Sequence, residues 1–292
     1  MDAELFKIAG LVLLVKARKD YLEDALRDFA YTGTDKPDVF VTVVTEQQQD
    51  YSQGKLLIED NLLSISETES AYFVRYHGFS YVEGYINRKY TGESVVYLHG
   101  QSCKSVPDEI KRQEVMCTIR DAFFFHMQKK GRIAIHSASV VYRDRVWLFA
   151  AMSGTGKTTH IALWHENGYP ARDFNGDLAI CYIDNSDAVA AGSPWCGTSG
   201  VYCNEERKFG GIVFLEQAEE NSVRNMTVGE SVMRLAARCL TPNWNRELMT
   251  LNLNVAEQMA PIILSGVLNC NMNPAAAAKA KEFIDEACST DA

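Results

Sequence analysis

The feature that most restricts how this chain can fold is a glycine-rich loop near its middle, Ala151-Met152-Ser153-Gly154-Thr155-Gly156-Lys157-Thr158. Its two glycines allow backbone angles that other residues avoid, so successive N–H groups can converge on one anion. A lysine and a threonine then follow with the spacing of a Walker A loop, in which they reach phosphate oxygens and a magnesium ion. Such a loop needs a strand before it and a helix after it, which predicts an α/β nucleotide-binding domain.

The sequence around the loop agrees with this requirement. The apolar run 146–150 predicts the strand that leads in, and a helix is expected to run from the loop to about Asn167, where Gly168 and Pro170 end it. We therefore expect ATP or GTP with Mg²⁺ to bind at the loop, with Thr158 as a metal ligand. The residues predicted to surround the phosphates are Ser153, Gly154, Thr155, Gly156, Lys157, Thr158 and Thr159.

Phosphoryl transfer also needs a carboxylate that holds the metal ion, accepts a proton from the attacking group, or does both. Asp177 is the best candidate, because it opens an apolar strand one helix after the loop. Asp173 is the competing candidate, and an ordinary turn aspartate is the alternative. His136 lies in the run 133–141, which predicts one strand; it is either a hydrogen-bonded core residue or a group that acts beside the transferred phosphate.

The segment 192–200 is rich in glycines and hydroxyl groups. It is either a loop that closes over a phosphate or a substrate, or a tight turn without further role. Arg207 and Lys208 follow it and are the nearest cations for phosphate charge, unless they form a solvated surface pair. We expect His160 and His165, in the helix after the loop, to be structural or exposed.

The first hundred residues predict short strands separated by polar or glycine-containing turns, as in an antiparallel sheet or a small sandwich. The runs are 6–15, 39–44, 56–58, 62–65, 72–76, 81–86 and 95–98. A helix follows, with Ser105 as its expected cap and apolar residues at 110, 116, 119, 123 and 127. The expected division is a β-rich domain at 1–104 and a nucleotide-binding domain at 105–292, with 105–130 as the connecting helix. Within the second domain, 178–183 and 211–215 predict strands, whereas 228–240 and 274–288 predict helices.

Composition narrows the functional classes. The chain has 292 residues, 47% of them hydrophobic, and a formal net charge of −9, which disfavours nucleic acid and anionic membranes as partners. The apolar stretch 8–15 is too short to span a bilayer, which takes about 20 residues, and no basic segment precedes it. The eight scattered cysteines predict reduced thiols and a cytoplasmic protein.

The region from His136 to about Arg238 resembles the HPr kinase/phosphorylase family and its relatives, which share a nucleotide-binding fold with PEP carboxykinase. A histidine precedes the loop, the loop reads Ser-Gly-Thr-Gly-Lys-Thr, and Asn-Gly-Asp at 175–177 opens a strand. Together with the segments 192–200 and 211–217, these motifs look like a poorly characterised HPr-kinase-like branch. The chain departs from the true kinases in two respects: Gly176 replaces the first of two paired aspartates, and their later Glu-x-Arg-Gly-Leu-Gly signature is missing.

The resemblance implies a Mg²⁺-dependent phosphotransferase that moves the γ-phosphate of ATP or GTP to a hydroxyl of a protein, peptide or small molecule. In that reading Lys157 and Thr158 hold phosphate and metal, Asp177 is the base or a metal ligand, and His136 tunes that acid. The resemblance also suggests a homo-oligomer. A catalytically weak nucleotide-binding regulator and a PEP carboxykinase-like enzyme are the alternatives; the second would need a cluster of arginines for an acid substrate.

Overall fold

The computed structural model of the chain describes residues 2–45, 49–99, 105–152 and 154–290. They form a mixed α/β protein with two compact units. Unit 1 contains the chain up to Lys130 together with Pro242–Arg246, and unit 2 contains Gly131–Thr241 and the chain from Glu247 onward. The sequence suggested a boundary before the helix at 105–130, whereas unit 1 includes that helix. Among the described residues, no helix has both the length and the apolar character needed to cross a membrane.

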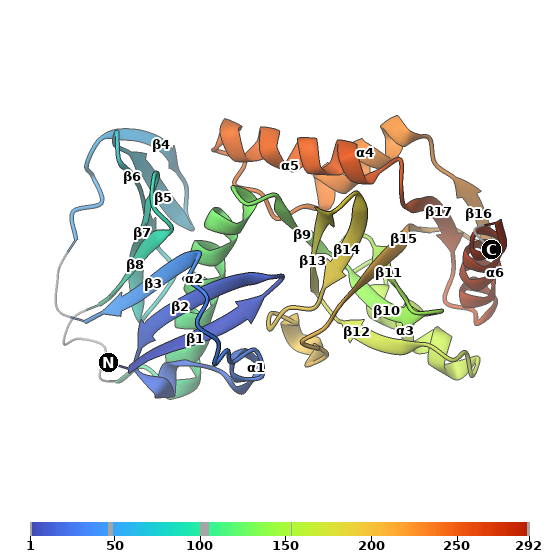
Figure 1. The fold of residues 1–292 in the computed structure, drawn as a ribbon, viewed down its shortest axis with the longest axis horizontal. Helices are drawn as coiled ribbons and strands as arrows, with labels where there is room; N and C mark the ends of the chain where they lie inside the picture. Colours follow the sequence, from blue (N-terminus) through green and yellow to red (C-terminus); the bar gives the residue numbers. More distant parts are fainter. Residues whose placement is uncertain (1, 46–48, 100–104, 153, 291–292) are drawn as a thin grey trace. The chain divides into compact units, whose positions relative to one another are not determined.

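Unit 1 is built on one eight-stranded sheet with the order β1-β2-β3-β8-β7-β6-β5-β4 (Figure 1). The connection between β2 and β3 contains a 3₁₀ turn, Lys19–Tyr21, and the short helix α1, Asp24–Arg27. The strands are β1 (Asp2–Ile8), β2 (Leu11–Ala17), β3 (Val39–Val44), β4 (Lys55–Glu59), β5 (Leu63–Glu67), β6 (Ala71–Tyr76), β7 (Val82–Arg88) and β8 (Glu93–Leu98).

The sheet of unit 1 differs from the antiparallel sheet or sandwich that the sequence suggested. β3 pairs in parallel with both β2 and β8, while the other neighbours are antiparallel. The run 6–15, predicted as one strand, is broken into β1 and β2. Ala9 and Gly10 both have positive φ at this point, and the chain reverses there into a hairpin.

Helix α2 (Asp108–Gln128) packs on this sheet. Its predicted apolar face is buried at Met116, Ile119, Phe123 and Met127, whereas Ile110 is exposed. The expectation that Ser105 caps the helix is wrong: the residue before the first turn is Pro107, and no side chain caps the helix there. Proline suits this place because the first N–H groups of a helix lack intrahelical partners.

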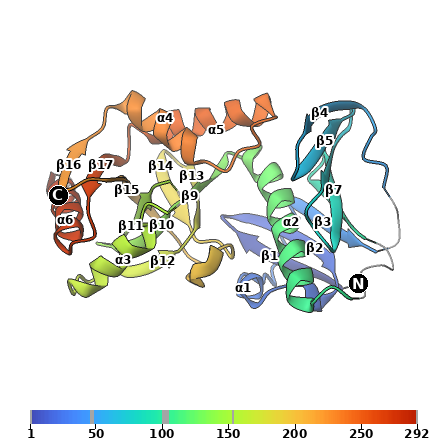
Figure 2. The same cartoon turned by 180° about the vertical axis from the view of Figure 1, so that it is seen from behind.

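Unit 2 contains two sheets that share the long strand β15 (Glu206–Gln217). One sheet has the order β9-β13-β14-β15, and the other has β12-β10-β11-β15-β17-β16 (Figure 2). The remaining strands are β9 (Arg132–His136), β10 (Ala138–Tyr142), β11 (Arg145–Ala150), β12 (Arg172–Asn175), β13 (Leu178–Asp184), β14 (Asp187–Ala191), β16 (Ser222–Asn225) and β17 (Leu264–Cys270).

The helices of unit 2 bury opposite faces of these sheets. α3 (Lys157–Glu166) and α6 (Ala275–Thr290) contribute apolar side chains to one cluster with Trp147, Phe149 and Leu268. α4 (Val228–Arg238) and α5 (Arg246–Met259) contribute to another with Ile135, Leu148 and Ile212. The central strands therefore have apolar residues on both faces, as a sheet covered on two sides requires.

The strand expected over 133–141 is wrong, because the chain breaks at Ser137. β9 pairs with β13, while β10 pairs with β11 and β12, so the two halves of that run lie in different sheets. His136 consequently does not share a strand face with Ala138. The break places His136 at the end of β9, where the chain passes from one sheet to the other.

Stability of unit 1 should depend on one buried carboxylate. Glu114 of α2 is 7% exposed and accepts hydrogen bonds from the N–H groups of Ser80, Tyr81 and Val82, at 2.7–3.0 Å. We predict that Glu114→Gln weakens the start of β7 and costs about 2 kcal/mol, since it removes charge-assisted bonds. Amide exchange at Tyr81 and Val82 should accelerate, whereas exposed Glu109→Gln on the same helix should leave it unchanged. Unaltered exchange in Glu114→Gln would contradict this role.

Candidate functional site

The glycine-rich loop lies between the central strand β11 and helix α3. β11 pairs with β10 on one side and runs parallel to β15 on the other, so the loop leaves the sheet at its middle. Gly154 and Gly156 have φ values of 78° and 108°, in the region that favours glycine. The backbone angle, and not a close neighbour, favours glycine at position 154, because a Cβ there would have no neighbour within 4 Å among the described residues. Ser153, also predicted to bind phosphate, lies outside the described residues.

The other predicted phosphate ligands follow the loop into the helix. Thr155 N–H donates to Met152 O at 3.2 Å, and α3 begins at Lys157. Thr158 is exposed, whereas Thr159 is half-buried and faces Gly156. The first N–H groups of α3 therefore sit at a helix N-terminus, which favours anions.

Lys157 has both an acid and a second cation in its electrostatic surroundings. Burial lowers the pKa of its ammonium below the ordinary value, the charge of Asp177 opposes that change, and the charge of Arg238 adds to it. The charge of the predicted acid thus acts on the loop lysine, although Asp177 lies 20 positions after Lys157 in the chain. Arg238, at the end of α4, was not predicted from the sequence.

Asp177 and His136 form a direct pair. Nε2 of the histidine lies 3.2 Å from Oδ1 of the aspartate, and both side chains are about one-third exposed, at 34% and 32%. The antiparallel pairing of β9 and β13 places His136 opposite Leu178, and Ser137 N–H donates to the Asp177 carbonyl at 2.9 Å. The structure therefore pairs Asp177 with His136, and the charge of Asp177 also acts on the pKa of Lys157.

The turn that carries Asp177 is held by a buried asparagine. Oδ1 of Asn175 accepts from the N–H groups of Asp177 and Leu178, at 2.9 and 2.7 Å, and its Nδ2 donates to Ser193 O at 2.9 Å. Ser139 Oγ donates to the Asn175 carbonyl and accepts from the Asn175 N–H. With both ends of its amide bonded, Asn175 fixes the backbone from which the Asp177 side chain extends.

The glycine-rich segment 192–200 packs against this acid turn. A Cβ on Gly176 would lie 1.9 Å from Ser199 Oγ, and one on Gly197 would lie 3.1 Å from the carboxyl carbon of Asp177. A side chain at 176 would therefore clash with Ser199, whereas Gly197 is favoured by its positive φ of 59°. The sequence left two interpretations of this segment open: a loop that closes over a phosphate or a substrate, and a tight turn without further role. The structure adds that the segment borders Asp177.

The other predicted charges have different partners. Asp173, the competing acid, lies 2.6 Å from His165 in an exposed pair. Arg207 pairs with Glu205 at 2.8 Å, and Lys208 lies 3.8 Å from Asp187, so these cations form surface pairs. The cations beside the loop are instead Arg234 and Arg238.

Arg234 and Arg238 line one cavity of about 290 Å³ with Ala151, Thr155 and Gln217. The two arginines are four residues apart on α4 and so share one helix face, and this spacing was the available sequence signal. A second cavity of about 290 Å³ lies on the other side of the loop, between Thr159 and Met272. A third, of about 190 Å³, is lined by Thr158, Ile161, Asn175, Gly176 and Val201. The loop thus borders three hollows.

The oxygen donors present suit magnesium. Thr158 offers a hydroxyl and Asp177 a carboxylate, and Mg²⁺ usually binds one or two such protein ligands together with phosphate oxygens and water. Within the described part of the chain, no group of three or more histidine, cysteine or acidic side chains converges as a metal cage would require. The donor set therefore fits a metal ion that arrives with a nucleotide.

No protein-family model and no curated protein sequence matches this chain. One solved structure that resembles it is the HPr(Ser) kinase/phosphatase from Coxiella burnetii, with 8% sequence identity and a TM-score of 0.30. The alignment covers 55% of this chain and 99% of that one. A TM-score of this size does not establish a common fold, so the motifs alone carry the family resemblance.

The helix behind the loop should respond to acid through His160. This residue is 3% exposed, and burial lowers its pKa from 6.5 to about 4. Its Nε2 accepts from Trp164 Nε1 at 3.2 Å. Because the unfolded chain takes up the proton first, stability is full above pH 6.5 and falls as the pH drops to about 4, by about 3 kcal/mol for this group.

We predict that His160→Gln reduces this acid-induced loss, because glutamine does not titrate while its oxygen can still accept from Trp164. The free energy of urea unfolding at pH 7 and pH 4.5 measures the effect. His165→Gln, an exposed position on the same helix, is the matched control. An equal loss in the wild type and in His160→Gln would show that His160 does not titrate as described.

Proposed function

We propose that this chain binds a magnesium–nucleoside triphosphate at residues 153–159 and transfers the γ-phosphoryl group to a hydroxyl acceptor. The observation that supports this most directly is the contact between His136 and Asp177, whose charge also acts on Lys157 of the loop. Lys157 begins α3, Asp177 precedes β13 and interacts electrostatically with Lys157, and His136 ends β9 within 3.2 Å of that aspartate. A cation for phosphate, an acid and a group that orients the acid are the parts that phosphoryl transfer needs.

Each residue has a role in this proposal. The N–H groups of the loop and the ammonium of Lys157 bind the β- and γ-phosphates. Thr158 and Asp177 are the protein ligands for Mg²⁺, which when bound neutralises charge on the phosphate oxygens. His136 positions the carboxylate of Asp177 through their contact. Arg238 adds positive charge on the side of α4.

In the transfer, the acceptor oxygen forms a bond to the γ-phosphorus while the bond from that phosphorus to the β,γ-bridging oxygen breaks. The nucleoside diphosphate leaves, and the hydroxyl proton passes to Asp177 when that residue acts as the base. If Asp177 serves only as a metal ligand, the proton leaves to water. The acceptor is a protein, a peptide or a small molecule in the cytoplasm.

The resemblance of the motifs to those of HPr kinases supports phosphoryl transfer as the reaction. We do not propose HPr itself as the acceptor. Those kinases have two adjacent aspartates, and here Gly176 stands in the first place. This single acid also favours a second function, a nucleotide-binding regulator with weak catalysis. The two functions share the nucleotide and differ in whether Asp177 supports turnover.

Nucleotide binding is tested at Lys157. We predict that Lys157→Ala lowers the affinity for Mg·ATP or Mg·GTP by roughly ten- to a hundredfold, the size of a lost charge-assisted bond of about 1.5–3 kcal/mol. Titration calorimetry measures the affinity, and circular dichroism checks that the fold is retained. Lys208→Ala, a surface lysine of β15, is the matched control. Absence of nucleotide binding by the wild type would remove both functions.

Catalysis is tested at Asp177. We predict that Asp177→Asn lowers transfer from [γ-³²P]ATP to candidate acceptors by about a hundredfold or more, the range attributed to a positioned acid or base. It should still bind nucleotide. Asp184→Asn, an exposed aspartate at the end of β13, should transfer normally. A wild type that binds nucleotide without transfer or hydrolysis would favour the regulator.

A further inference from the structure

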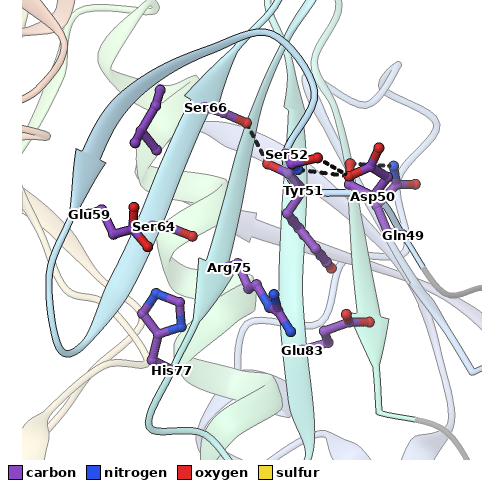
Figure 3. A pocket seen from close by; sticks show the side chains of 11 residues that line it. Gln49, Asp50, Tyr51, Ser52, Glu59, Ser64, Ser66, Arg75, His77 and Glu83 are labelled. Atoms are coloured by element: carbon purple, nitrogen blue, oxygen red, sulfur yellow. Dashed lines mark hydrogen bonds between the residues drawn. The ribbon is translucent and has the colours of Figure 1, made fainter.

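Unit 1 contains a polar cavity of about 750 Å³ (Figure 3). It lies on the face of the sheet opposite α2. Tyr72 and Tyr76 of β6 contact α2 at Phe125 and Asp121, and alternation along the strand turns Arg75 to the other face, where it lines the cavity. The cavity is thus formed by β4–β7 and by the segment that precedes β4.

Two deeply buried polar side chains face this cavity. Tyr51 is 7% exposed and Glu83 is 8% exposed. The Tyr51 hydroxyl has no hydrogen-bond partner among the described residues, and the Glu83 carboxylate makes neither an ion pair nor a hydrogen bond within that part of the chain. Burial raises the pKa of Tyr51, and the charge of Glu83 raises it further.

Arg75 adds a positive charge beside Tyr51 and Glu83 in this cavity. Arg75 also acts on the pKa of Tyr51, which it lowers, but its guanidinium forms no ion pair with any described residue. Figure 3 shows the Arg75 guanidinium, the Glu83 carboxylate and the Tyr51 hydroxyl directed into the same space. Because the guanidinium and the carboxylate face one space and do not pair with each other, a ligand with one negative and one positive group can bind both.

The local backbone is arranged to present these groups. The pairing of β7 with β8 shifts register between Val82 and Gly84, a bulge that changes the direction of Glu83. A Cβ on Gly84 would lie 2.2 Å from the Val74 carbonyl oxygen and 2.8 Å from the Tyr51 ring, so both the neighbouring strand and the tyrosine pack closely on this glycine. Ser66 Oγ donates to the Tyr51 carbonyl at 2.7 Å and holds this segment on the sheet.

The charges of the cavity define the ligand. A buried hydroxyl without a partner is costly, and a ligand that accepts a hydrogen bond from Tyr51 recovers that cost. Glu59 adds a second carboxylate without a described partner, whereas Asp50 already accepts from Ser52. Three carboxylates, those of Asp50, Glu59 and Glu83, thus line the cavity together with one guanidinium.

We propose that this cavity binds a free basic amino acid, whose α-carboxylate pairs with Arg75 and whose ammonium groups pair with Glu83 and Glu59. The Tyr51 hydroxyl donates to the bound carboxylate. A guanidinium suits a carboxylate because it can donate two parallel N–H bonds. This site is independent of the nucleotide loop, so it stands whether or not the chain transfers phosphate.

The test uses the full chain and three ligands of similar length. L-lysine carries all three charged groups, cadaverine lacks the carboxylate, and L-norleucine lacks the side-chain ammonium. Calorimetry should show that L-lysine binds in the millimolar range or tighter, and that each of the others binds at least about tenfold more weakly, as for one lost charge-assisted contact. No binding of L-lysine up to tens of millimolar, or equal binding of all three, would overturn the proposal.

Variants assign the contacts. Arg75→Gln should abolish the preference for L-lysine over cadaverine, and Glu83→Gln should weaken L-lysine binding about tenfold or more. Glu69→Gln, an exposed glutamate in the turn before β6, is the matched control. Binding that is unchanged in both cavity variants would place the ligand elsewhere.

Tyr51→Phe separates a binding role from a structural one. Because the hydroxyl is unpartnered in the free protein, its removal should leave the unfolding temperature unchanged or raise it, while L-lysine binding weakens several-fold. A hydroxyl with a purely structural role would give the reverse result: lower stability with unchanged affinity.

Discussion

The candidate phosphotransfer site depends on the buried amide of Asn175. This side chain receives two backbone N–H groups of the turn that carries Asp177, and it donates to the carbonyl of Ser193 in the neighbouring segment. A buried amide with both ends bonded tolerates few rotations, because each alternative leaves a polar group without a partner. The position of Asp177 relative to His136 is therefore set by a residue that does no chemistry.

The strand β15 supplies the second constraint. Its first residues pair with β14, and its later residues lie between β11 and β17. One continuous strand thus pairs both with β11, which leads into the glycine-rich loop, and with β14, whose neighbour β13 follows Asp177. The backbone hydrogen bonds of β15 therefore connect the element before the loop with the element after the acid.

Local patterns predicted the glycine-rich loop, the strand before it and the helices α2, α3, α4 and α6, because glycines and helical spacing can be recognised from neighbouring residues. The break at Ser137 was not predicted, since no glycine or proline marks it and the two strands are separated by their non-local pairing. The helix α5 was missed although Leu248, Val255 and Met259 carry helical spacing. The sequence identified Asp177 and His136 as catalytic candidates. Their contact with each other, and the effect of Arg238 on Lys157, arise from tertiary structure and could not be predicted.

The close approach of Gly176 to Ser199 has a consequence for how such chains can diverge. Any side chain at 176 would occupy the volume now filled by the Ser199 hydroxyl, which is itself bonded to Cys196 O at 2.6 Å. A second acid next to Asp177 therefore requires the Ser199 side chain to move or to be replaced by a smaller one. Positions 176 and 199 thus form a coupled pair, in which a side chain at one depends on the residue at the other.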